Sequence, residues 1–168
     1  MAEKSIFTAK EIAFLRALQS EGVGFMIVGA AAAALQGAPV VTQDVDLWFK
    51  DLNDQGIKKA LDKVGGAFIP SIGFHPPSFA GPAVELFDVV LTMHGLGAFD
   101  EEIKNTTPIR LGRLAVRILN LERIIKSKET IRRPKDQLMV PVLKDALAAI
   151  RSKEKSRKRK GRKNLSQK

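Results

Sequence analysis

Two aspartates one residue apart, Asp44 and Asp46, lie in a run of apolar and β-branched residues that predicts a strand over 43–49. Because side chains alternate along a strand, the two carboxylates share one face, and the apolar residues between and beyond them supply the other. Two like charges so close are unfavourable unless a cation lies between them. Their oxygens suit Mg²⁺, which commonly takes one or two carboxylates plus substrate phosphates. The alternative is an exposed, polar strand face with no ligand.

A glycine turn precedes these acids. The run FMIVG, residues 25–29, predicts a short buried strand, and residues 30–37 predict a short helix that follows Gly29 directly. A glycine at such a turn allows close backbone approach, and a helix N-terminus offers free N–H groups and a positive dipole end to a phosphate. The sequence therefore predicts a phosphate site near the two acids.

A third acid, Asp88, lies inside VELFDVVLTM, residues 84–93, which is the strongest strand prediction by its β-branched and aromatic content. Asp88 shares its strand face with Leu86 and Val90, where an apolar residue is expected. If this strand neighbours the one over 43–49, the three carboxylates converge. Three carboxylates beside a phosphate cradle would suit two-metal phosphoryl transfer.

The remaining pattern predicts the elements that position these residues. The fold class is α/β (α+β), a small mixed β-sheet flanked by α-helices. Thr8 and Glu11 form a capping-box pattern, Asn53 is a candidate cap, and residues 65–83 look like a Gly- and Pro-rich loop. Further helices are expected over 8–20, 53–64, 99–104 and 119–129, with a strand over 115–119 and a last helix that either starts near Pro141 or bends there.

The charge is concentrated at the C-terminal end. Residues 151–168 hold ten Lys or Arg and one acid, whereas the other 150 residues are nearly neutral. A block so poor in apolar residues repels itself, so we expect a domain over 1–150 and a disordered basic tail over Arg151 to Lys168. Such a tail could bind RNA or DNA through phosphate contacts, or serve only to keep the protein in solution.

Several classes of site are unsupported by the composition. The chain has no cysteine, which excludes disulfides and thiolate metal sites, and its two histidines are too few for a histidine-rich metal site. The first residues lack the pattern of a signal peptide, and no apolar run approaches the roughly 20 residues that span a bilayer. We therefore expect a cytoplasmic protein with no membrane partner.

The ordered motifs resemble a known family. The run VGA-x(7)-G-x(4)-T-x-D-V-D-L, the strand acid in FDVVLTMHGLGAFDEEI and the later LNLERIIKSKETIRRPKD occur in that order. They resemble minimal nucleotidyltransferases of the polymerase-β-like superfamily, in the branch that includes the nucleotidyltransferases of abortive-infection and toxin–antitoxin systems. The resemblance covers roughly residues 25–150 and leaves the basic tail outside.

The resemblance implies roles for individual residues. Asp44, Asp46 and Asp88 would be the catalytic, metal-binding acids, and Asp88 would also orient the attacking group. The cofactor would be Mg²⁺ (or Mn²⁺), and the substrate a nucleoside triphosphate such as ATP. A nucleoside monophosphate would then pass to a hydroxyl of a protein, RNA or small molecule. The implied nucleotide-binding residues are Gly29, Ala30, Thr42, Lys128, Arg133 and Lys135.

Three positions depart from the family pattern. Ala30 replaces a Ser or Gly, Val40 replaces a frequent Arg, and Met139 replaces a frequent acid. These changes remove possible phosphate contacts but leave the three acids in place. The alternative is therefore a non-catalytic protein of the same fold, acting as a nucleic-acid-binding or toxin–antitoxin component with a protein partner.

Overall fold

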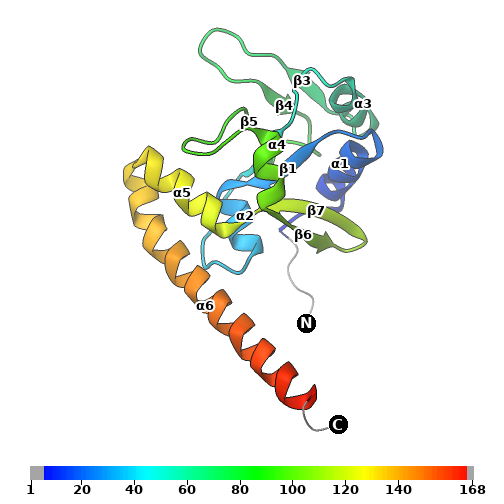
Figure 1. Cartoon of the computed structure of the whole chain (residues 1–168). Coiled ribbons are helices and arrows are strands. Elements are labelled where there is room, and N and C mark those ends of the chain that lie inside the picture. Colours follow the sequence, from blue (N-terminus) through cyan, green and yellow to red (C-terminus); the bar gives the residue numbers. More distant parts are fainter. Residues whose placement is uncertain (1–5, 166–168) are drawn as a thin grey trace.

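The computed structural model describes residues 6–165 and has a mixed five-stranded sheet with helices on both faces (Figure 1). The helices are α1 (Ala9–Ser20), α2 (Gly29–Leu35), α3 (Gln55–Lys63), α4 (Phe99–Glu102), the 3₁₀ helix η1 (Ile103–Asn105), α5 (Leu121–Ile131) and α6 (Pro134–Leu165). The strands are β1 (Phe25–Val28), β2 (Val45–Phe49), β3 (Ala67–Ile69), β4 (Ser78–Ala80), β5 (Phe87–Val90), β6 (Thr106–Leu111) and β7 (Leu114–Leu119).

The main sheet has the strand order β5-β2-β1-β7-β6. β2 runs parallel to β5 and antiparallel to β1, while β1 is parallel to β7 and β7 is antiparallel to β6. All four residues of β1 are buried, as expected for a central strand that is covered on both faces. The expected fold class, a small mixed sheet flanked by helices, is confirmed.

The two faces of β2 have different neighbours. On the face of Val45, Leu47 and Phe49, aromatic rings from several elements pack together, and Phe14 of α1 contacts both Phe79 and Phe87. On the opposite face, Trp48 packs edge-on against Phe99 of α4, and Asp46 lies beside the start of α2. The first face is therefore a closed aromatic core, and the second face carries the acids.

Some short elements were not predicted from the sequence. Residues 65–83 were expected to form a loop, yet they contain the antiparallel pair β3–β4. The strand β6, which contains Pro108, was not predicted either. Pro108 is tolerated because β6 is an edge strand, where a missing N–H need not break the sheet. The cap of α3 is Asp54, which accepts a hydrogen bond from the N–H of Gly56 at 2.8 Å, and not Asn53.

The expectation of a disordered tail from Arg151 is wrong for residues 151–165, which form the second half of α6. The helix also begins before Pro141 and continues through it. The disorder was predicted from charge repulsion, but Lys and Arg are good helix formers. The first half of α6 packs against α5, so the helix is already nucleated where the charged segment begins. Residues 166–168 lie outside the described part of the chain.

Candidate active site

The three predicted acids lie at one edge of the β2–β5 pair. Asp46 of β2 and Asp88 of β5 are directly paired residues of two parallel strands, so their side chains leave the sheet on the same face. Asp44 comes one residue before β2 and is exposed, whereas Asp46 is half-buried. The expected convergence of the two strands is therefore present in the structure.

The electrostatics of these acids reflect their mutual repulsion. Burial raises the pKa of Asp46, and the charges of Asp88 and Asp44 raise it further, while Lys128 and Lys135 oppose the shift. Burial and the charge of Asp44 likewise raise the pKa of Asp88. In the described part of the chain none of the three acids forms an ion pair. The site thus carries negative charge that no contacting cation neutralises.

The glycine turn lies against the second of these acids. Gly29 has a φ of +67°, and a Cβ atom there would overlap with Oδ2 of Asp46. Only glycine accepts this backbone conformation without strain, and only glycine leaves room for the carboxylate. The next residue, Ala30, has no hydroxyl to offer. The turn therefore brings the backbone of residues 29–30 next to Asp46.

A cavity of about 250 Å³ opens in front of Asp46. Its walls come from β2, the end of β5 and the segment that follows it, the first residue of α2, and α5 with the link to α6. The predicted residues that line it are Gly29, Asp46, Lys128 and Arg133, and Thr92, Met93 and His94 join them from the segment after β5. Asp44, Asp88, Ala30, Thr42 and Lys135 are not among its lining residues.

Two cations of this cavity are held by an acid to which the sequence analysis gave no role. Asp136 is fully buried, and its carboxylate accepts hydrogen bonds from Lys128 at 2.9 Å and from Arg133 at 2.7 Å. Burial alone would raise the pKa of Asp136, but the two cations outweigh it and lower the pKa. The Arg133 side chain is still 53% exposed, so part of its guanidinium remains open to a ligand. The sequence did contain a signal for this ion pair, because Asp136 follows Arg133 by three residues, a spacing at which side chains on a helix meet.

Two other predicted residues occupy less direct positions. The hydroxyl of Thr42 donates to the backbone carbonyl of Asp44 at 2.9 Å, so Thr42 orders the segment that leads into β2. Lys135 is exposed and forms no ion pair or side-chain hydrogen bond with the acids in the described part of the chain, although its charge lowers the pKa of Asp46. Thr42 therefore acts on the position of Asp44, and Lys135 contributes to the field around Asp46.

The acids do not form a closed metal cage as they lie. Within residues 6–165, no three His, Asp or Glu side chains are grouped closely enough to hold a metal ion. The carboxylate oxygens nevertheless suit a hard divalent cation. The three acids form no ion pair in the described chain and lie at the same end of β2 and β5. Side-chain rotation at the exposed Asp44 and Asp88 would be needed to bring their oxygens toward Asp46.

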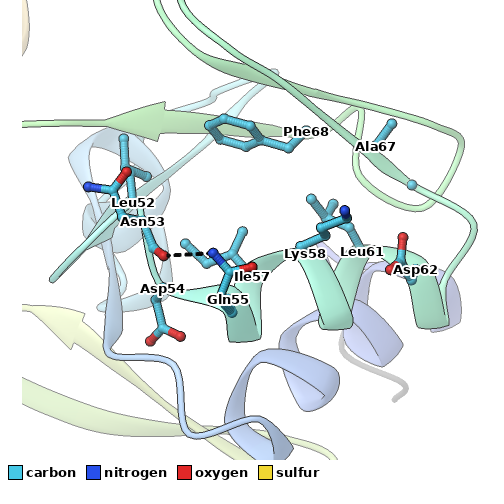
Figure 2. Close-up of a pocket in the computed structure, with 11 residues that line it drawn as sticks. Leu52, Asn53, Asp54, Gln55, Ile57, Lys58, Leu61, Asp62, Ala67 and Phe68 are labelled. Carbon is cyan, nitrogen blue, oxygen red and sulfur yellow. Dashed lines mark hydrogen bonds between the residues drawn. The ribbon is translucent and has the colours of Figure 1, made fainter.

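A larger hollow, of about 450 Å³, lies between α3 and β3 (Figure 2). Leu52, Ile57, Leu61 and Phe68 line it, and the Gln55 side chain donates to the backbone carbonyl of Asn53 at 3.4 Å. None of the predicted site residues lines this hollow, and Lys58 is its only cation. Of these two cavities, only the smaller one is lined by predicted site residues.

Comparison with solved structures decides the fold. The chain is similar to ANT(2″)-Ia in complex with adenylyl-2″-tobramycin, with a TM-score of 0.52 at 16% identity over 88% of this chain and 99% of that one. It is equally similar to the solution structure of the antibiotic-resistance factor ANT(2″)-Ia, with a TM-score of 0.52 and 16% identity, covering 91% of this chain and 95% of that one. An antigenic nucleotidyltransferase-like protein from Paracoccidioides brasiliensis matches with a TM-score of 0.50 and 18% identity over 88% of both chains.

The chain has the nucleotidyltransferase fold. This agrees with the polymerase-β-like resemblance of its motifs. No protein-family model matches the sequence, and no curated protein matches it. The nucleotidyltransferase fold of this chain is thus evident from its structure at a sequence identity below 20%. No helix in the described part of the chain is long and apolar enough to cross a membrane.

Proposed function

We propose that this protein transfers a nucleoside monophosphate from a nucleoside triphosphate to a hydroxyl group of a protein, an RNA or a small molecule. The observation that carries the proposal is the pairing of Asp46 with Asp88 across β2 and β5, beside a cavity that also presents Lys128 and Arg133. A pair of acids, one of which lines the cavity, and two cations in its wall suit a substrate with a polyphosphate chain and its bound metal ion.

The cationic wall would hold the phosphates. Arg133 presents a planar fork of N–H donors that matches phosphate oxygens, and Lys128 supplies a point charge from deeper in the cavity. The buried Asp136 fixes both cations before the substrate arrives, which reduces the ordering that binding requires. The backbone of the turn at Gly29 and Ala30 would also approach the phosphates, since Gly29 lines the cavity.

The three acids would hold the metal. Asp44, Asp46 and Asp88 are the residues that would bind Mg²⁺ or Mn²⁺, and the bound ion would neutralise phosphate charge and polarise the reacting phosphate. Thr42 would keep Asp44 in position through its hydrogen bond to the backbone of that residue. The absence of any ion pair to these acids in the described chain leaves their charge free for this role.

The chemistry is a substitution at the α-phosphorus. The acceptor hydroxyl oxygen forms a bond to that phosphorus, the bond to the oxygen bridging to the β-phosphate breaks, and pyrophosphate leaves with the electron pair. Asp88 would accept the hydroxyl proton. The Asp88 side chain is exposed, so its carboxylate is accessible to an acceptor hydroxyl. Lys128 and Arg133 would stabilise the charge on the departing pyrophosphate.

The test is nucleotide binding followed by transfer. We expect calorimetry to show binding of at least one nucleoside triphosphate in the presence of Mg²⁺, and α-labelled triphosphate to label a hydroxyl acceptor with release of pyrophosphate. Asp46→Asn and Asp88→Asn should each reduce transfer by at least 100-fold, since an interaction with a metal-held phosphate is worth several kcal/mol.

The control is Asp145→Asn, which alters an exposed acid on α6 that makes no ion pair or side-chain hydrogen bond in the described structure. It should leave binding and transfer unchanged. The proposal fails if the protein binds no nucleotide and no divalent cation. Binding that survives without transfer to any acceptor would instead favour the non-catalytic alternative.

A further inference from the structure

The second half of α6 is a strongly charged, isolated segment. We define the basic arm as residues 151–162, which hold eight Lys or Arg and a single acid, Glu154. Every one of these residues is exposed. In Figure 1, α6 packs beside α5 near its start and then extends past the body of the protein. The basic arm is thus a helix with solvent around it.

Most cations of the basic arm have no acidic partner. Arg151 donates to Glu122 of α5 at 2.9 Å. Within residues 6–165, no ion pair involves any other Lys or Arg of the basic arm. Seven like charges remain along about 15 Å of helix. Such a segment repels itself, and a polyanion bound along it would relieve that repulsion.

The composition of the basic arm selects among polyanions. It contains no apolar or aromatic side chain. A helix that lies in a membrane interface needs an apolar face, so an anionic bilayer is disfavoured. Without aromatic rings the basic arm cannot stack bases either, so its contacts would be to phosphates and independent of sequence. The phosphate backbone of a nucleic acid fits this chemistry.

The distance between the basic arm and the candidate active site indicates how long a ligand must be to reach both. At 1.5 Å per helical residue, Arg151 lies about 25 Å along α6 from Pro134, and Arg162 about 42 Å. Pro134 follows Arg133, which lines the cavity. A small-molecule acceptor cannot touch both places. A polynucleotide of about ten to fifteen residues can span them.

We propose that the basic arm binds the phosphate backbone of a nucleic acid and that this nucleic acid carries the acceptor hydroxyl. The binding half of the inference stands alone, and the acceptor half rests on the proposed nucleotidyl transfer. The basic arm holds the polynucleotide by its backbone, and one end of the strand reaches the cavity in front of Asp46.

The experiment compares two charge-matched variants of the full chain by fluorescence anisotropy with a labelled 30-nucleotide RNA hairpin and with DNA of the same sequence. The arm variant replaces four cations by glutamine: Arg157, Lys158, Arg159 and Lys160. The control variant replaces four exposed cations of the body by glutamine: Lys10, Lys58, Lys104 and Arg113. Glutamine is a good helix former, and circular dichroism verifies that α6 is retained.

We expect the arm variant to lose at least 10-fold in affinity at about 150 mM salt, and the control variant less than twofold. The slope of log affinity against log salt should fall by about 2 to 3 in the arm variant, since each phosphate contact contributes about 0.7 to 0.9 and not all four side chains reach one ligand. Comparison of the RNA and DNA probes shows whether the basic arm prefers one of these two nucleic acids.

Equal losses in the two variants would overturn the inference, as would equally tight binding to polyglutamate or to vesicles rich in phosphatidylserine. Nucleotide binding measured in parallel separates the two proposals. If the wild type transfers label to small acceptors but never to a nucleic acid, the acceptor half fails while the proposed function stands. If the wild type binds no nucleotide at all, the proposed function fails, and the anisotropy result still decides the binding half.

Discussion

A Cβ atom on Gly29 would lie 3.2 Å from Cγ of Asp46 and would overlap with its Oδ2 atom. The turn that ends β1 and the acid of β2 are thus packed against each other, because Val28 and Asp46 are paired residues of the antiparallel strands. The position of the carboxylate depends on the absence of a side chain at residue 29. This relationship links the glycine turn to the acid in a way that can be tested.

Gly29→Ala should displace Asp46 and abolish nucleotide and metal binding. The positive φ and the overlap together should lower the free energy of unfolding by about 2 to 3 kcal/mol. Chemical denaturation and calorimetry measure the two effects. Gly22→Ala is the matched control, because Gly22 has a φ of +72° and nothing within 4 Å of the added carbon. Gly22→Ala should lower the free energy of unfolding by less, because it adds only backbone strain, and it should leave ligand binding unchanged.

Asp46→Asn, which should reduce transfer by at least 100-fold, should nevertheless stabilise the fold at pH 7. The pKa of Asp46 is raised by burial and by Asp88, so its charged form is disfavoured in the folded state. Removing one of two like charges on directly paired residues is expected to add about 0.5 kcal/mol to the free energy of unfolding. Denaturation at pH 7 measures this gain. A loss of stability comparable to a core mutation would contradict the assignment of Asp46 to a ligand site.

The same shift has a pH signature. The pKa values of Asp46 and Asp88 are higher in the folded state than in the unfolded state. Their contribution to the free energy of unfolding is therefore most favourable below the pKa of an unfolded Asp, about 4. It is lost as the pH rises through the folded pKa values. The difference in stability between wild type and the Asp46→Asn, Asp88→Asn double variant should therefore grow between about pH 4 and pH 7. A difference that is constant across this range would be evidence against the shifts.

Asp136 should behave in the opposite way. Its pKa is lowered by Arg133 and Lys128 despite burial, so its stabilising contribution is present above the unfolded pKa and is lost as the pH falls through the folded value. Asp136→Ala should cost about 3 kcal/mol at pH 7, because it leaves Lys128 largely buried without its partner. It should also weaken nucleotide binding by releasing Arg133.

The control for Asp136 is Glu129→Gln, which breaks an exposed ion pair with Lys144. Exposed pairs contribute about 0 to 1 kcal/mol, so this variant should be nearly neutral. Denaturation curves at pH 7 and below pH 4 compare the two variants. If Asp136→Ala lowered stability but left nucleotide affinity intact, Asp136 would support the fold and not the position of Lys128 and Arg133.

Glu102 provides a purely structural comparison. A hydrogen bond from Arg123 lowers its pKa against the opposing effect of burial, and the N–H of Gly97 and the amide of Asn105 add to the shift. Glu102→Gln should lower the free energy of unfolding at pH 7 by about 2 kcal/mol, since it leaves a half-buried guanidinium without its anion. This loss should vanish at low pH, where Glu102 is protonated in the wild type as well. Nucleotide binding should not change.

The sequence by itself determined the local elements whose signals are short-range. The capping box of Thr8 and Glu11, the turn at Gly29 and the alternation around Asp46 depend only on residues within a few positions of each other, and all three are present in the structure. The fold class followed from the order of these elements. The three acids and Gly29 were likewise selected as candidate site residues from their types and spacing.

Only the tertiary structure decided which of the candidate residues lie close together. The register that pairs Asp46 with Asp88 depends on the alignment of strands 42 residues apart, which no local pattern contains. The same is true of Asp136, whose burial arises from packing between α5 and α6. The basic arm shows the converse, because local charge predicted disorder, while continuity with a packed helix made it helical. Long-range packing, and not composition, sets these relationships.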